Sequence, residues 1–252
     1  MTRRRHVISI GVLFCALLPM AEVLGESCDA WVQRAVSGPS ARTGYVLSYH
    51  PEESNLVLFG GFNGVSLLDD TWVWDGTVWT EVALAGAHPS AREGAAMSEA
   101  PAHLGDVLLF GGEDAGGLRN DTWKWNGTNW SPFTIPGPPH TPPPPARDAA
   151  MAYRRTPTLH GVLFGGFGAG NTAFDETYLW SADRWIFTGA FVRPPARGAH
   201  AMAHDPTRDE MVMFGGMTGD GETLGDTWVY KHLPAEWEPR TPLNSPSPRA
   251  FH

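Results

Sequence analysis

The sequence predicts an all-β protein built from four copies of a unit of about fifty residues. Glycine pairs recur at spacings of 51, 54 and 50 residues, and each pair follows an apolar run that is too short for a helix. Tryptophan or tyrosine residues then follow at nearly constant distances. A fixed period of this length is typical of repeat architectures. The pairs are Gly60 and Gly61, Gly111 and Gly112, Gly165 and Gly166, and Gly215 and Gly216.

Each unit is expected to contain four strands. The apolar run before each glycine pair, such as Leu56 to Phe59, predicts a buried strand. About ten residues later a second strand begins with an acidic residue, a threonine and an aromatic residue. A third strand starts at a tryptophan, and a proline-containing loop then leads to an arginine that opens the remaining strand. The aromatic marks of the two strands are Trp72 and Trp79, Trp123 and Trp130, Tyr178 and Trp185, and Trp228 and Trp237.

This order of marks resembles the kelch family, in which each repeat folds as one four-stranded blade of a β-propeller related to galactose oxidase. The repeats cover residues 42–83, 92–133, 147–188 and 197–240, and a fifth begins at 249–252. The resemblance implies a kelch-type propeller with four complete blades and partial strands at both ends.

The partial strands raise the question of ring closure. Trp31 marks a last strand without its three partners, and Arg249 opens a first strand that stops at His252. We therefore expect a truncated or open propeller, whose exposed blade edges favour self-association. A strained ring of four blades is the alternative, but it leaves one terminal strand redundant.

Residues 1–25 are typical of a signal peptide. Three arginines precede an apolar run from Val7 to Leu18, and small residues end the segment at Gly25. The run is too short to cross a bilayer, so we expect no membrane span and a secreted chain, extracellular or periplasmic, that comprises the propeller at 26–252. Cys28 is then the single cysteine of the exported chain, which excludes an internal disulfide.

Charge argues against two classes of partner. The net charge is −9, and removal of residues 1–25 takes away three arginines and Glu22, which brings it to −11. Nucleic acids and anionic lipid surfaces are bound through clustered lysine and arginine. We therefore expect neither partner.

The repeated arginines predict a charged face. Loops at the same end of each blade bring together one arginine and one acidic residue per repeat. Such a ring has two interpretations: forked arginine contacts that bind a sugar acid or another carboxylate, or clamps that hold the loops of each blade. Clamps are favoured, because marks present in every repeat usually maintain the repeat. The binding candidates are Arg42, Arg92, Arg147 and Arg197.

Features that belong to one repeat are better functional candidates. Asp114 and Asp220 lie in glycine-rich acidic loops, but their spacing matches no calcium loop, so no metal is predicted. The proline-rich loop from Pro136 to Pro145 is either a stiff bridge between blades or a displayed polyproline ligand, and the bridge is favoured.

Function is predicted as a non-enzymatic scaffold that binds a protein or a carbohydrate at the loop face. No familiar catalytic or cofactor motif occurs, so no catalytic residue and no cofactor are assigned. One alternative is a sugar-modifying enzyme, which the resemblance suggests in the form of a sialic acid epimerase or, less well, galactose oxidase. The other alternative is a fragment of a larger kelch protein.

Overall fold

The computed structural model describes residues 37–100, 106–134, 142–154, 160–232 and 235–252, and they belong to one compact unit. The described residues form an all-β structure with a single short 3₁₀ turn, η1, at Ala169–Asn171. This confirms the predicted fold class. The predicted signal peptide, Cys28 and the Trp31 strand lie outside the described residues.

Four antiparallel sheets of four strands correspond to the four repeats, and we call them blades 1 to 4. Blade 1 contains β1 (Val46–His50), β2 (Asn55–Phe62), β3 (Leu67–Trp74) and β4 (Trp79–Glu81). Blade 2 contains β6 (Ala96–Glu99), β7 (Val107–Phe110), β10 (Thr122–Trp125) and β11 (Trp130–Phe133). Blade 3 contains β12 (Ala150–Arg154), β13 (His160–Phe164), β14 (Thr177–Trp180) and β15 (Trp185–Thr188). Blade 4 contains β16 (Ala201–Asp205), β17 (Glu210–Phe214), β18 (Thr227–Lys231) and β19 (Glu236–Arg240).

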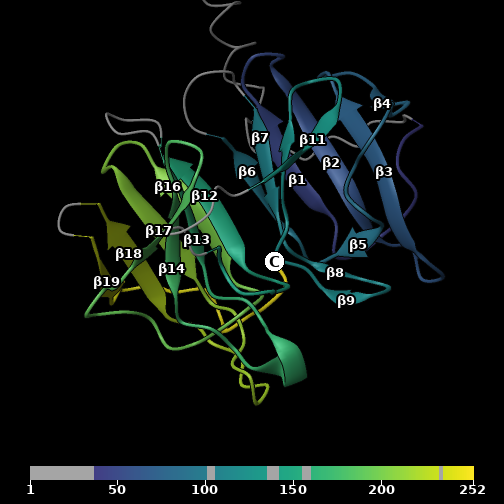
Figure 1. Cartoon of the computed structure of the whole chain (residues 1–252). Helices are drawn as coiled ribbons and strands as arrows, with labels where there is room; N and C mark the ends of the chain where they lie inside the picture. The colour runs from purple at the N-terminus through teal and green to yellow at the C-terminus, as the bar shows by residue number, and fades with distance from the viewer. Residues whose placement is uncertain (1–36, 101–105, 135–141, 155–159, 233–234) are drawn as a thin grey trace, which may run out of the picture. The chain divides into compact units, whose positions relative to one another are not determined.

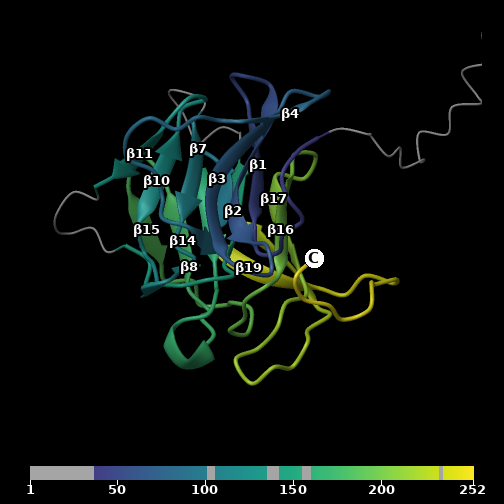
Figure 2. The same cartoon turned by 90° about the vertical axis from the view of Figure 1, so that its right-hand side faces the viewer.

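The first strands of the blades lie side by side in chain order, since β1 contacts β6, β6 contacts β12, and β12 contacts β16 (Figure 1). A small extra sheet of β5 (Arg92–Glu93), β8 (Glu113–Asp114) and β9 (Gly117–Leu118) joins blade 2 at one end. Figure 2 shows β8 and the η1 turn at the same end of the blades.

The glycine pairs lie where the second strand of one blade meets the backbone of the next. Gly60 has a φ of 65°, and a Cβ atom there would lie 2.7 Å from the carbonyl oxygen of Arg92 in the following blade. A left-handed conformation and this close approach both favour glycine. The pairs therefore set the spacing between blades.

The core consists of three apolar clusters, one at each junction between consecutive blades. At each junction a tryptophan of one blade donates its indole N–H to a threonine hydroxyl of the preceding blade, and both residues are buried. The bonds are Trp130 Nε1 to Thr71 Oγ1 at 2.9 Å, Trp185 Nε1 to Thr122 Oγ1 at 3.0 Å, and Trp237 Nε1 to Thr177 Oγ1 at 2.9 Å.

The two terminal blades are less covered than the two blades between them. Tyr45, Leu47 and Tyr49 in and before β1 are 45%, 45% and 39% exposed, whereas Met97 and Met151, the counterparts of Leu47, are buried. On blade 4, Thr227 is only partly buried, unlike the three junction threonines. Self-association through these faces stays a prediction.

The substitution Thr122→Val tests the junction bond. Valine keeps the shape of threonine but leaves the buried N–H of Trp185 without an acceptor, so we expect a loss of about 1–3 kcal/mol in the free energy of unfolding. Chemical denaturation followed by tryptophan fluorescence measures it. Thr227→Val is the matched control, because no described tryptophan donates to Thr227, and it should change stability by less than about 0.5 kcal/mol. Equal effects of the two variants would contradict the assignment.

Candidate functional site

Arginines at the ends of the blades are held in a repeated arrangement that we call the arginine clamp. In blade 2, Arg92 donates to both carboxylate oxygens of Asp121, at 2.6 and 2.9 Å, and to the carbonyl oxygen of Gly111 at 2.9 Å. Trp123 adds an indole N–H bond to Asp121 at 2.8 Å. The same clamp joins Arg42 to Asp70, Gly60 and Trp72, and Arg197 to Asp226, Gly215 and Trp228.

Each clamp carboxylate accepts three hydrogen bonds from side chains of its own blade. Burial alone would raise the pKa of these aspartates, but the hydrogen bonds from arginine and tryptophan outweigh it, so the pKa of Asp70, Asp121 and Asp226 lies below its usual range. The side chains of Arg92 and Arg197 are 2% and 0% exposed. These arginines are therefore enclosed within their own blades rather than presented to a ligand, which fits the clamp interpretation.

Blade 3 corrects the predicted set of arginines. Strand pairing aligns Ala150 with Ala96 and Ala201, so Ala146, four residues earlier, occupies the place of Arg92 and Arg197. Arg147 lies one residue further along the chain. The longer proline-rich loop before Arg147 changes the spacing between the repeats. For this reason the sequence alone aligned Arg147, and not Ala146, with the arginines of the other repeats.

Arg147 makes different contacts from the clamp arginines. Its guanidinium donates to Asp148 and, at 2.8 Å, to Asn171 Oδ1. It also lies 3.2 Å from Glu113 and 5.4 Å from the ring centre of Phe167. Arg147 therefore ties the η1 turn to the loop of the small extra sheet.

Arg249 shares one local hydrogen bond with the clamp arginines but does not form the clamp itself. It donates from Nε to the carbonyl of Ser247 at 3.1 Å, as Arg92 does to Ser90. Within the described part of the chain no carboxylate pairs with it. The next residues continue the repeat, because the ring of His252 packs on Phe214 as the ring of His200 packs on Phe164.

Asp114 is held in an internal network. Its side chain is 5% exposed and accepts hydrogen bonds from Ser90 Oγ at 2.6 Å, Arg119 Nε at 2.6 Å and Gly116 N at 2.8 Å. Burial alone would raise the pKa of Asp114, but these bonds lower it to about 2. The carboxylate is thus satisfied by protein donors.

Asp220 lies in an exposed turn and accepts a hydrogen bond from Thr218, which lowers its pKa. The structure does not bring Asp220 close to Asp114 or to the clamps. Among the residues that the structure describes, no group of three or more potential ligands is arranged to hold a metal ion. No helix in this part of the chain has the length and apolar character that a membrane crossing needs.

The starts of the four inner strands surround a hollow of about 760 Å³, which we call the inner hollow. Its wall is mostly apolar, with Arg42, Asp148, His200 and His252 as the ionisable groups. Neither Arg92 nor Arg197 lines it. Residues 42–47, 94–97, 148–151, 199–202 and 251–252 form the wall.

A chain of backbone hydrogen bonds runs along the wall of the inner hollow. Each blade contributes one residue with a left-handed φ, between 55° and 63°, and its N–H donates to the carbonyl of the corresponding residue in the preceding blade. The bonds run from Gly94 to Gly44 at 2.9 Å, Asp148 to Gly94 at 2.7 Å, Ala199 to Asp148 at 2.8 Å and Phe251 to Ala199 at 2.9 Å.

His200 lines the hollow but is fully packed. Burial, together with the nearby charges of Arg197 and His252, lowers the pKa of His200 to about 3. Neither ring nitrogen has a hydrogen-bond partner in the described structure. His200 is therefore neutral at physiological pH and contributes an uncharged ring to the wall.

Sequence reasoning did not identify the inner hollow. The repeated alternation of small and apolar residues in the first strands was the available signal, but its meaning depends on how the blades pack.

Comparison with known proteins identifies relatives for most of the chain. Residues 26–191 match the kelch-repeats domain described as KLHDC2/KLHL20/DRC7. The chain is 32% identical over 148 residues to tRNA wybutosine-synthesizing protein 4 of Emericella nidulans, which covers 56% of this chain and 14% of that protein. It is 27% identical over 219 residues to an F-box/kelch-repeat protein of Arabidopsis thaliana, which covers 78% of this chain and 43% of that protein. The chain thus spans less than half the length of these curated relatives.

The substitution Asp114→Asn should change the response of the protein to acid. Because the pKa of Asp114 is about 2 in the folded state and ordinarily 3.8, its carboxylate stabilises the fold above about pH 4, and this contribution is lost as the pH falls towards 2. The variant lacks the contribution at pH 7 and should therefore lose less stability than the wild type between pH 5 and pH 2. Urea unfolding at a series of pH values measures this.

Asp220→Asn is the control for the acid experiment, because Asp220 is exposed and its interaction is screened by water. Its stability curve should follow that of the wild type closely. A curve for Asp114→Asn that runs parallel to the wild-type curve from pH 7 to pH 2 would contradict the role given to Asp114.

Proposed function

Because this chain belongs to the kelch-repeat family, we propose that it is a non-enzymatic scaffold that binds an apolar segment of a partner protein in the inner hollow. The observation that carries the proposal is the character of this hollow. Its volume of about 760 Å³ lies in the range of ligand sites, and its wall is formed by apolar residues of four blades.

The side chains of the hollow suit a protein partner better than a sugar acid. Tyr45 and Leu47 are each 45% exposed and Phe251 is 67% exposed. Met97, Met151 and Met202 add flexible thioether side chains to the wall. Aromatic residues and methionine are enriched at protein interfaces, and methionine adapts to differently shaped partners.

The enzyme alternative derives no support from the arginines. A site for a sugar acid would need several arginines that converge on one pocket. Arg92 and Arg197 are instead enclosed in clamps, and Arg147 bonds the neighbouring loop. The protein-binding proposal therefore stands on the hollow and not on the charged positions.

We also propose that the chain is exported, on the basis of the arginine-rich and apolar order of residues 1–25.

The binding proposal is tested by selecting peptides from a random display library on the immobilised full chain. Leu47→Asp places a charge in the inner hollow and should weaken the selected peptides at least about tenfold in fluorescence anisotropy titrations, since a buried charge opposes apolar contact. Val192→Asp is the matched control, because Val192 is 47% exposed, close to the 45% of Leu47, and lies outside the hollow.

Two results would contradict the binding proposal. The first is equal affinity of the selected peptides for the two variants. The second is a chain that selects no peptide but binds acidic oligosaccharides on a glycan array, which would favour the sugar-directed alternative.

Export is tested by expressing the full-length chain in a secretory host and sequencing the N-terminus of the product. The expected product lies outside the cytoplasm and begins near Glu26. A product that stays in the cytoplasm with residues 1–25 attached would contradict export.

A further inference from the structure

Blade 3 has different residues at all three side-chain positions of the arginine clamp. Ala146 stands in the place of Arg92, Glu176 in the place of Asp121, and Tyr178 in the place of Trp123. The glycine of the clamp is kept as Gly165, and its N–H donates to the Glu176 carbonyl at 3.2 Å. The backbone frame of the clamp is thus retained while its guanidinium is missing.

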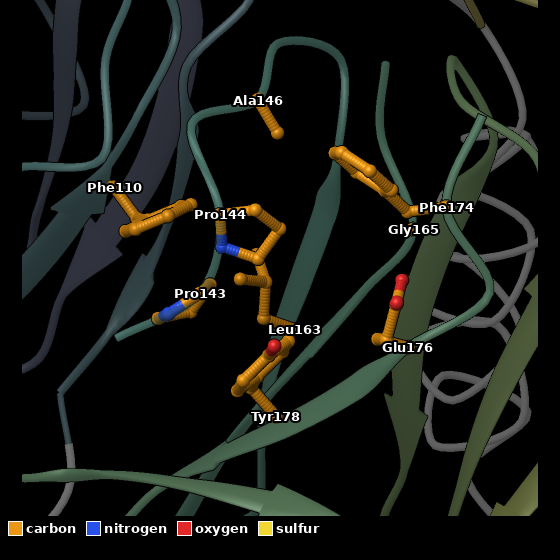
Figure 3. Close-up of a pocket in the computed structure, with 9 residues that line it drawn as sticks. All are labelled: Phe110, Pro143, Pro144, Ala146, Leu163, Gly165, Phe174, Glu176 and Tyr178. Atoms are coloured by element: carbon orange, nitrogen blue, oxygen red, sulfur yellow. The ribbon is translucent and has the colours of Figure 1, made fainter. Parts of the chain in front are cut away.

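A small cavity lies where the guanidinium would be. Its wall includes Ala146, Gly165 and Glu176, together with the rings of Phe110, Phe174 and Tyr178. Figure 3 shows Glu176 on one side of this cavity and Pro143 and Pro144 on the other. The volume is about 10 Å³, which is room for one group the size of a water molecule.

One carboxylate oxygen of Glu176 lies unpaired at the cavity. This atom, Oε2, is enclosed and has no hydrogen-bond partner within the described structure. An enclosed carboxylate oxygen without a donor is costly, and folded proteins rarely leave one unpaired. In the other blades the corresponding carboxylates accept nitrogen donors at 2.5 to 2.9 Å.

We propose that this cavity is a binding site for a single primary ammonium group. One nitrogen takes the place that the arginine Nη1 holds in the other clamps and donates to Glu176 Oε2 and to the carbonyl of Gly165. The surrounding aromatic rings add cation–π attraction for a desolvated ammonium. A whole guanidinium is too large for the space, and one carboxylate among aromatic rings is a poor site for calcium or magnesium.

The site is independent of the inner hollow, and the end of the loop at Pro143 and Pro144 closes it. Pro143 and Pro144, at the end of the proline-rich loop, therefore form part of the site. These two prolines fill part of the space left by the missing arginine.

The test is thermal unfolding of the full chain in 100 mM ammonium chloride or methylammonium chloride, against equal ionic strength of sodium, potassium or tetramethylammonium chloride. If the salt is present at about ten times its dissociation constant, we expect a rise in Tm of about 3 °C. Ammonium and methylammonium distinguish a free ion from an amine that carries an alkyl chain. Tetramethylammonium lacks N–H donors and exceeds the cavity, so it should act like sodium.

Two variants link the effect to this cavity. Glu176→Gln removes the charge and should abolish the ammonium effect, and it should fold well because it removes an unpaired carboxylate. Ala146→Val extends a side chain that lines the cavity into its small volume and should also abolish the effect. Arg147→Met is the control; it changes the adjacent residue outside the cavity and should keep the effect.

The proposal is overturned if ammonium raises Tm no more than sodium or potassium does, or if Glu176→Gln retains the full effect. Retention of the effect in Ala146→Val would place the ion elsewhere and would also overturn it. None of these results depends on peptide binding in the inner hollow.

Discussion

The buried bond between a tryptophan N–H and a threonine hydroxyl is the contact on which the arrangement of blades depends. It repeats at every junction between consecutive blades that the structure describes, at 2.9 to 3.0 Å. Apolar packing is not directional, so the apolar clusters alone would tolerate small slips of one blade along another. An indole N–H that must find one hydroxyl in a dry interface fixes the register, and the glycine pairs permit the close approach that this register needs.

Two kinds of repeated contact therefore have separate tasks. The junction bonds and the left-handed residues join neighbouring blades, whereas the arginine clamp joins loops within one blade. This separation explains why the clamp arginines are not available to bind a ligand. Their guanidinium groups are paired with aspartates inside the blade. The surfaces left for recognition are the apolar wall of the inner hollow and the position in blade 3 where alanine takes the place of the clamp arginine.

The sequence was sufficient for the repeat, the four-stranded blades and their marks, because Gly-Gly and tryptophan report directly on backbone geometry and buried area. It was insufficient to show which residue of blade 3 takes the place of the clamp arginine. Arg147 lies one residue from Ala146, and only the pairing of Ala150 with Phe164 shows which of them faces Glu176. Asp114 was taken as a loop acid because its donors, Ser90 and Arg119, come from segments that only the small extra sheet brings together. The inner hollow involves four blades and has no local signature.

The loss of the clamp in blade 3 has a consequence for how such chains diverge. Thr177 and Trp185 still make their junction bonds although Ala146, Glu176 and Tyr178 have replaced the clamp. A duplicated repeat can therefore drift within its own loops without disturbing the neighbours on either side. Sequence change can thus be confined to one blade at a time. A blade without the clamp arginine offers a position at which a new binding specificity can arise.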